Sequence, residues 1–315
     1  MYDLGLQRLR DIFQLEPVEF PTTKKLGSST EERAKDLIAT FENPEIKAVI
    51  ATIGGDDQVT YVKDLPPEPF INNPKPFFGY SDNSHFMNFL WLNGIPSYYG
   101  GSIMTQFAMQ GEMDDYTVKY LKHALFESGE VELKPSDDFN DIGLDWGDES
   151  NLSRLRAYEK NDGWYWDGSK NATGITWGGC LESIDKMFRH DIQIPSLDDF
   201  RNIILVTETS EEIPSHDYVK RVYTELGERG ILERVQGILV GRPKAWEFDK
   251  PQSPEQRQVY RDQQRKTIID VVRQCNADIP IVQNMDFGHS DPQIPMPYGG
   301  NVRIDTAARN LFAQF

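Results

Sequence analysis

Short apolar segments alternate with helical patterns along the first hundred residues of the chain. A tandem capping-box signature at residues 28–32 precedes apolar positions at helical spacing over 34–41. A second helix is predicted over 83–92. The apolar segments, each predicted to be a strand, are 48–53, 77–80 and 95–99. This alternation is typical of a parallel sheet covered by helices on both faces, so we predict an α/β fold.

The second half of the chain repeats the alternation after a long segment of different character. Residues 130–176 are rich in Asp, Gly and Trp and show little periodicity, which is typical of a functional loop or a linker. Strands are predicted afterwards at 203–206, 238–240 and 279–282. We therefore expect an N-terminal domain over residues 1–165 and a smaller C-terminal α/β domain over residues 166–315.

Charge and composition exclude several classes of protein. The 315 residues carry a formal net charge of −17, which would repel a phosphate backbone, so we expect no nucleic acid partner. No apolar run approaches the roughly 20 residues that span a bilayer, and the N-terminus lacks the layout of a secretory signal. We expect no membrane partner and a cytoplasmic location. Cys180 and Cys275 lack the paired spacing of a zinc site, and two free thiols are expected rather than one disulfide.

The sharpest local feature is a diglycine followed by a serine, Gly100-Gly101-Ser102, between a predicted strand and a helical pattern. Glycines permit a tight turn there, which can project the serine oxygen beside the positive end of a helix. The simpler interpretation is that Ser102 only caps the helix. The motif is not the G-x-S-x-G elbow of the α/β-hydrolases, so on its own it favours the cap.

A serine nucleophile needs a base, and the chain offers only five histidines. His289 lies in a loop directly after a predicted strand, where an imidazole can be presented into a cleft. His85 follows a turn at residues 81–82 and could approach a site, but an ordinary role in its helix is favoured. The other three lie in charged helical stretches or begin a helix, and we expect them at the surface: His123, His190 and His216.

Two strand ends carry acidic residues that could serve a site. Glu208 follows the strand at 203–206 and could orient an imidazole, although a solvated acid is the simpler interpretation among 50 acidic residues. The turn Gly54-Gly55-Asp56-Asp57 ends an earlier strand. Its N–H groups could bind an oxyanion, or its two acids could bind a metal or face water. Two acids alone are too few ligands, so we predict no metal site.

Six short segments, spread over most of the chain, form an ordered set. They are Ile53-Gly54-Gly55-Asp56-Asp57, Gly79-Tyr80-Ser81-Asp82, Gly100-Gly101-Ser102, Trp177-Gly178-Gly179, Val206-Thr207-Glu208-Thr209-Ser210-Glu211 and Phe287-Gly288-His289. Together they resemble the LD-carboxypeptidase family of serine peptidases, which includes the muramoyl-tetrapeptide carboxypeptidases and the microcin immunity peptidases. Each segment alone is weak, whereas their order is specific.

The resemblance implies a Rossmann-like N-terminal domain that carries the nucleophile and a C-terminal domain that carries its partners. Ser102 would attack an amide carbonyl, His289 would take its proton and pass it to the leaving amine, and Glu208 would orient His289. The oxyanion hole would be formed by N–H groups of Gly55, Asp56 and Ile103, and the substrate contacts by Gly101, Asp82 and Trp177. The family also implies a homodimer that uses no metal or organic cofactor.

The long segment 130–176, with its tryptophans, resembles the microcin immunity branch, whose members cleave the amide between an aminoacyl group and a nucleotide-like moiety. We therefore expect a peptide or an aminoacyl-nucleotide-like substrate.

Three departures from the family stand out. The chain begins in a helical pattern where members have a strand, Cys180 stands where the family often has asparagine, and residues 246–261 have no interpretation. The first two favour an alternative, a two-domain binding protein without the chemistry; a metal-dependent hydrolase using Asp56 and Asp57 is a third hypothesis.

Overall fold

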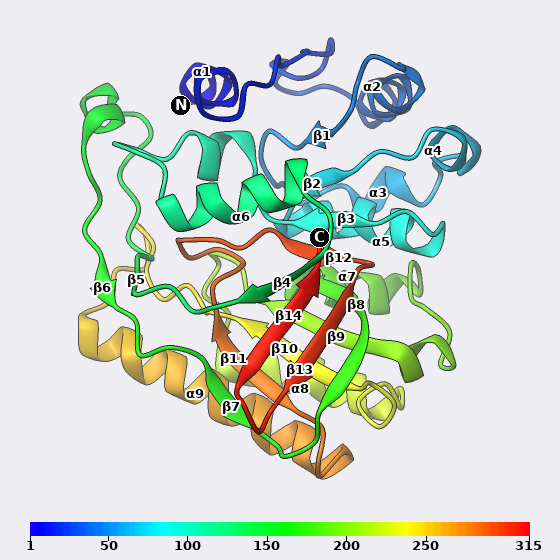
Figure 1. The fold of residues 1–315 in the computed structure, drawn as a ribbon, viewed down its shortest axis with the longest axis vertical. Helices are drawn as coiled ribbons and strands as arrows, with labels where there is room; N and C mark the ends of the chain where they lie inside the picture. The colour runs from blue at the N-terminus through cyan, green and yellow to red at the C-terminus, as the bar shows by residue number, and fades with distance from the viewer.

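A computed structural model describes residues 1–315, and Figure 1 shows its helices and strands. The α-helices are α1 (Tyr2–Phe13), α2 (Thr30–Glu42), α3 (Val59–Val62), α4 (Glu68–Asn72), α5 (Ser84–Leu92), α6 (Asp115–Phe126), α7 (Leu181–His190), α8 (His216–Glu228) and α9 (Pro254–Cys275). Short 3-10 helices are η1 (Ser81–Asn83), η3 (Glu149–Ser153) and η4 (Asp199–Asn202), and η2 (Ile103–Phe107) is a π-helix. No helix is both long and apolar enough to cross a membrane.

The strands form two main sheets, one in the upper and one in the lower half of Figure 1. Their bounds are β1 (Val49–Ile50), β2 (Phe77–Gly79), β3 (Ser97–Tyr99), β4 (Glu130–Leu133), β5 (Asp138–Phe139), β6 (Glu159–Lys160), β7 (Tyr165–Asp167), β8 (Ala172–Cys180), β9 (Ile203–Glu208), β10 (Gly237–Gly241), β11 (Ile281–Met285), β12 (Met296–Tyr298), β13 (Asn301–Asp305) and β14 (Asn310–Gln314). The upper sheet has the order β1-β2-β3-β12 and the lower one β4-β14-β13-β8-β9-β10-β11-β7, while β5 and β6 pair separately. Strands β1 to β3 are parallel, as are β8 to β11, which confirms the α/β class.

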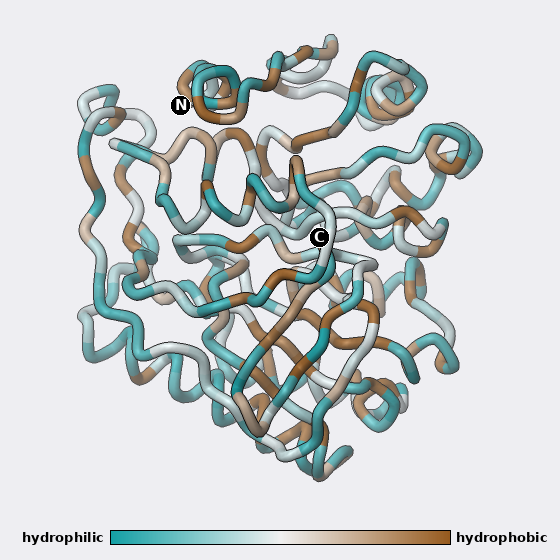
Figure 2. Tube along the Cα trace, in the orientation of Figure 1, coloured by the Kyte–Doolittle hydropathy of each residue, from teal (hydrophilic) through white to brown (hydrophobic).

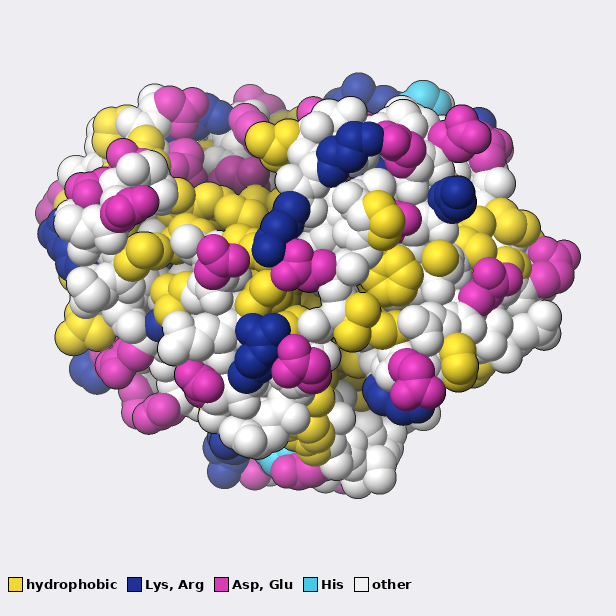
Figure 3. All heavy atoms as spheres, turned by 90° about the horizontal axis from the view of Figure 1, so that it is seen from above, with side chains coloured by type: hydrophobic (Ala, Val, Ile, Leu, Met, Phe, Trp, Pro, Cys, Tyr) yellow, Lys and Arg dark blue, Asp and Glu magenta, His cyan; other side chains and the backbone are white.

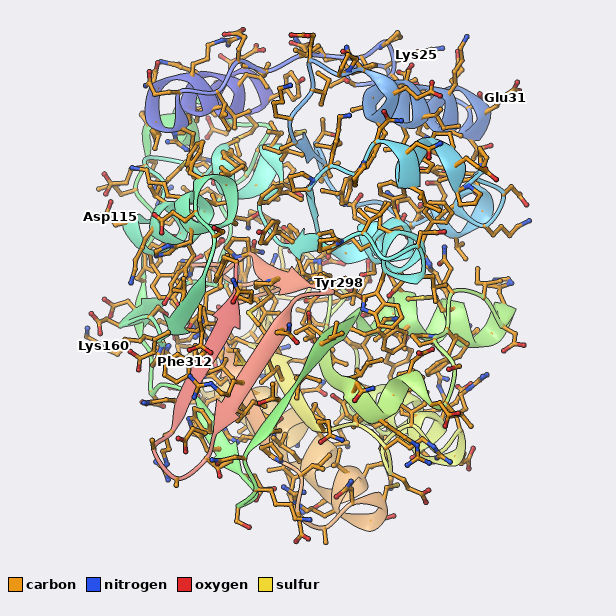
Figure 4. All side chains as sticks on the ribbon, turned by 45° about the vertical axis from the view of Figure 1, so that its right-hand side comes forward. Lys25, Glu31, Asp115, Lys160, Tyr298 and Phe312 are labelled. Atoms are coloured by element: carbon orange, nitrogen blue, oxygen red, sulfur yellow. The ribbon has the colours of Figure 1, made fainter.

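Two strands cross the boundary that the sequence predicts after residue 165. From the C-terminal half, β12 runs antiparallel to β3 and closes the upper sheet, with Met296 opposite Tyr99. From the N-terminal half, β4 pairs with β14 in the lower sheet. Figure 4 shows Tyr298 of β12 at the centre, where its hydroxyl donates to Asn88 Oδ1 at 2.5 Å and accepts from the N–H of Gly178 at 2.8 Å. The boundary itself stays a prediction, but the two halves share strands.

The core also joins the two sheets. A cluster of 38 buried residues includes Phe78 and Tyr99 from the upper sheet together with Val206 and Val302 from the lower one. A second cluster of 22 residues lies between the lower sheet and the helices α7, α8 and α9. Figure 2 shows hydrophobic segments along the strands and hydrophilic ones on the outer turns of the helices. A large shared apolar interface opposes free movement of one half against the other.

The segment 130–176 is more regular than its sequence indicates. It contains four short strands and the start of β8, the nine-residue strand in the middle of the lower sheet. The sequence pattern does not predict β8, because its glycines lower the strand propensity of this segment. Gly178 has a φ of +144°, and an added Cβ would lie 1.9 Å from the carbonyl oxygen of Val206, so the close approach of β8 to β9 requires glycine here.

A buried ion pair anchors this segment to the lower sheet. The carboxylate of Asp286 accepts a hydrogen bond from Arg242 at 2.6 Å, and neither side chain has any exposed surface. It also accepts from the hydroxyl of Ser136 at 2.6 Å and from the indole N–H of Trp164 at 2.9 Å. Buried charges persist only when they are paired and hydrogen-bonded, so this cluster ties both ends of residues 136–164 to β11.

Residues 246–261 acquire a structural role in the same region. Ser253 caps α9, whose first turns carry two arginines. Arg257 and Arg261 donate to the buried carboxylate of Asp141 at 2.8 and 2.7 Å. The start of α9 therefore holds the segment that Figure 1 shows running along the left edge of the molecule.

Candidate active site

The carboxyl ends of β3, β9 and β11 bring the candidate triad into one region. Glu208 is the last residue of β9 and is 1% exposed. Its Oε2 accepts a hydrogen bond from His289 Nδ1 at 2.7 Å, and its Oε1 accepts one from the hydroxyl of Tyr99 at 2.5 Å. The glutamate is therefore a buried orienting group for the imidazole and not a solvated strand-end acid.

The electrostatics of His289 follow from two carboxylates. Burial alone would lower the pKa of His289, but Glu208 and Glu211 outweigh burial and raise this pKa to about 10. Glu211 Oε2 lies 3.0 Å from His289 Nε2, and the same contact lowers the pKa of Glu211 to about 2. In this conformation the imidazole is a cation that is held on both nitrogens by carboxylates.

Ser102 does not cap the helix that follows it. Its side chain is fully buried, makes no cap hydrogen bond to η2, and leaves Oγ without any hydrogen-bond partner. The two preceding glycines have φ values of +138° and +75°, which favour glycine. An unpartnered buried hydroxyl is unusual, and it is consistent with a group that acts on a ligand.

Two glutamines that the sequence did not single out fasten the serine loop to the histidine loop. Gln293 accepts from the N–H of Gly101 at 3.2 Å and donates to the carbonyl of Gly288. Gln106 accepts from the serine N–H at 3.3 Å and donates to Asp291 at 3.2 Å. The residues next to Ser102 and next to His289 are therefore held at a fixed separation.

The three candidate oxyanion donors differ in their availability. The N–H of Ile103 donates to the carbonyl of Ala51 at 3.0 Å, so it is not free to bind an oxyanion in this conformation. The N–H groups of Gly55 and Asp56 make no intramolecular hydrogen bond. The carbonyl of Asp56 accepts from Lys186 of α7 at 2.7 Å, which ties this turn to the C-terminal half.

The three residues expected to contact substrate are all buried. The carboxylate of Asp82 is 4% exposed, accepts from the N–H of Gln58 at 2.9 Å, and has its pKa raised by burial. Gly101 is engaged by Gln293. Trp177 has no exposed surface and packs edge-on against Phe200 in the second core cluster, so in this conformation it offers no surface to a substrate.

Acidic and sulfur-bearing residues around the site are engaged in other contacts. Asp57 forms a bidentate pair with Arg33, at 2.9 and 2.5 Å, and no group of three or more His, Cys, Asp or Glu residues could hold a metal ion. Both cysteines are free, and Cys180 donates to Glu182 at 3.1 Å. Seen from above, Asp and Glu side chains are interspersed with Lys and Arg over the surface (Figure 3).

Comparisons with known proteins match both halves of the chain. The model of the LD-carboxypeptidase N-terminal domain matches residues 1–100, and that of the LD-carboxypeptidase C-terminal domain matches residues 173–304. The microcin C7 self-immunity protein MccF of Escherichia coli is 22% identical over 288 residues, which are 90% of this chain and 78% of that protein.

Solved structures of similar proteins share the fold. An MccF-like protein from Streptococcus pneumoniae, solved in complex with AMP, superposes with a TM-score of 0.86 at 28% identity and covers 99% of this chain and 92% of its own. MccF in complex with aspartyl sulfamoyl adenosine superposes with a TM-score of 0.83 at 21% identity, covering 100% of this chain and 91% of its own. The likeness therefore spans both sheets.

Proposed function

Because this chain belongs to the LD-carboxypeptidase family of serine peptidases, we propose that it cleaves an amide bond with Ser102 as nucleophile, His289 as base and Glu208 as orienting acid. The observation that carries the proposal is the buried 2.7 Å pair between His289 Nδ1 and Glu208. This contact assigns the proton on Nδ1 and leaves Nε2 for the chemistry. The unpartnered hydroxyl of Ser102 is the group that needs such a base.

The reaction follows the general course of acyl transfer to a serine. Ser102 Oγ attacks the amide carbonyl while a neutral His289 takes the hydroxyl proton on Nε2 and then gives it to the leaving amine. Water attacks the acyl-enzyme in a second step that uses the same base. The free N–H groups of Gly55 and Asp56 are the preferred donors to the oxyanion, since that of Ile103 is engaged.

For the substrate we propose an aminoacyl-nucleotide-like amide, with a short peptide as the other member of the class. Support comes from the ligands of similar proteins, AMP in one and aspartyl sulfamoyl adenosine in the other. We also propose that the protein is a homodimer, as the family resemblance implies, and that it is cytoplasmic.

One observation favours a second candidate function, a binding protein without turnover. His289 Nε2 contacts Glu211 at 3.0 Å, and Ser102 Oγ has no partner, so the catalytic hydrogen bond is absent in this conformation. In that case a ligand would bind beside Ser102 and His289 and leave unchanged.

Covalent labelling separates the two. We expect a fluorescent phosphonate to label wild-type protein at Ser102, as located by mass spectrometry, and alanyl sulfamoyl adenosine to be hydrolysed. Ser102→Ala, His289→Ala and Glu208→Ala should each reduce hydrolysis by about 10³-fold or more. His216→Ala, at an exposed histidine, is the matched control and should behave as wild type. Folded protein that binds alanyl sulfamoyl adenosine, remains unlabelled and shows no turnover would support the binding protein.

A further inference from the structure

The carboxylate of Glu211 contacts Nε2 of His289, the nitrogen that the proposed mechanism assigns to the hydroxyl of Ser102. Its Oε2 is 3.0 Å from His289 Nε2, while the buried hydroxyl of Ser102 has no partner at all. A base held in this way cannot accept a proton, because Nε2 already carries one. Something must remove Glu211 from the imidazole before each turnover.

The two carboxylates on His289 differ in their freedom to move. Glu208 has no exposed side-chain surface and is also held by the hydroxyl of Tyr99. Half of the Glu211 side chain is exposed, and it lies in the loop that follows β9. Glu211 can therefore turn towards a ligand at little cost in desolvation, whereas Glu208 cannot.

No free cation of the protein is placed to draw Glu211 away. Lys244, whose charge helps to lower the pKa of Glu211, bonds Glu247 at 2.6 Å, and Lys250 bonds Glu212 at 3.1 Å. A cation for Glu211 must then come from the ligand. Aminoacyl compounds with a free amino end supply one, since an α-amino group near the scissile carbonyl is largely protonated at neutral pH.

We infer that the Glu211 carboxylate receives a protonated amino group of the substrate, and that this pairing releases His289 Nε2 to the hydroxyl of Ser102. The inference rests on the proposed function and names the substrate class as amides whose acyl side carries a free amine. When Glu211 moves to the ammonium, the imidazolium loses a stabilising carboxylate and gains a nearby positive charge. Its Nε2 proton passes to solvent, and the neutral ring then takes the proton of the attacking hydroxyl.

The other ionisable groups around the ring do not supply this control. The ring of Tyr80 packs edge-on against that of His289, with the ring centroids 5.0 Å apart. Burial raises the pKa of Tyr80, so its hydroxyl stays protonated at neutral pH. The groups that face the ring or its two carboxylates are Glu208 from β9, Tyr99 from β3, Cys180 from β8, Glu182 from α7, Lys244 from the loop after β10, and Asp291 from the histidine loop. Glu211 alone is both in contact with Nε2 and exposed to a ligand.

The test compares Glu211→Gln with Glu212→Gln, the neighbouring acid, which pairs with Lys250 and does not contact His289. The substrates are alanyl sulfamoyl adenosine and its N-acetyl derivative, in which a neutral amide replaces the ammonium. We expect wild type and Glu212→Gln to prefer the free amine in kcat/KM by at least about tenfold, and Glu211→Gln to lose that preference.

A second measurement reports on the state of His289 in the absence of a substrate amine. An uncharged fluorescent phosphonate should label Glu211→Gln at least about tenfold faster than wild type at pH 7.5, because one carboxylate fewer holds the imidazolium. Glu212→Gln should match wild type. A wild-type preference for the N-acetyl compound, or a Glu211→Gln variant with the wild-type ratio and labelling rate, overturns the inference while Ser102 labelling keeps the proposed function. Absence of Ser102 labelling up to pH 10.5 overturns both.

Discussion

Replacing Asp286 with Asn removes the only charge partner of Arg242, whose side chain has no exposed surface. The amide keeps the size of the carboxylate and its hydrogen-bonding oxygen, so no cavity is created. What remains is a buried, uncompensated guanidinium, and loss of one partner of a buried pair costs about 3–5 kcal/mol in the free energy of unfolding. Because whole domains are stable by only about 5–15 kcal/mol, we expect a large fall in the midpoint of urea unfolding, followed by tryptophan fluorescence.

Two further variants show whether the reasoning is sound. Glu130→Gln breaks the exposed pair with Arg303, at 2.8 Å, and should leave the urea midpoint unchanged. The double variant Asp286→Asn with Arg242→Met removes both charges and should recover most of the lost stability. An Asp286→Asn protein that unfolds at the wild-type urea concentration would refute the claim that Asp286 and Arg242 form a buried ion pair in the native state.

Three further predictions concern the site. Labelling of the serine by an uncharged phosphonate should rise about tenfold per pH unit between pH 7 and 9, because only neutral His289 is a base and its pKa is raised to about 10; a flat rate over this range would contradict that assignment. Gly288→Ala should lower kcat/KM by about 10²-fold or more, since the added Cβ would lie 2.5 Å from Glu208 Oε2. Gly163 has a similar positive φ but open space around it, so Gly163→Ala should retain activity. Gln293→Leu removes the hydrogen bonds that Gln293 makes to Gly101 and to Gly288 and should lower kcat by about 10²-fold in a steady-state assay; an unchanged kcat would show that these two bonds are dispensable.

Much of the fold could be predicted because local signals agree with it. The helix expected over 83–92 is α5, and the strands expected at 203–206 and 238–240 lie within β9 and β10. The capping box of Ser29 and Glu32 is confirmed at the start of α2, whereas the hydroxyl of Ser28 bonds the carbonyl of Lys25 instead. These elements have apolar runs or caps that act over a few residues.

Other elements depend on contacts distant in the sequence and were not predicted. The first part of β8 falls in the segment that the sequence indicates to be irregular, because the glycines of this strand serve close packing on β9. β12, β13 and β14 were not anticipated either, since β12 contains a proline and pairs with a strand from the other half of the chain. Propensity carries no information on such pairings.

The candidate site divides in the same way. Ser102, Glu208 and His289 come from the family resemblance, and the structure brings Glu208 and His289 into contact. Glu211 and Gln293 were assigned no role, because a glutamate after a strand and a glutamine in a loop are ordinary residues. Only the relative placement of two loops reveals what they touch.

The pairing of β3 with β12 also sets the order in which the protein can fold during its synthesis. Tyr99 pairs with Met296, so the upper sheet lacks its last strand until synthesis has passed Met296. At typical speeds of synthesis this delay is about 10–40 s. During that time the serine turn lacks the glutamine that fastens it, because Gln293 is made just before β12. Until then a nascent chain carries Ser102 without His289 in place, so the proposed triad can assemble only after β12 has been made.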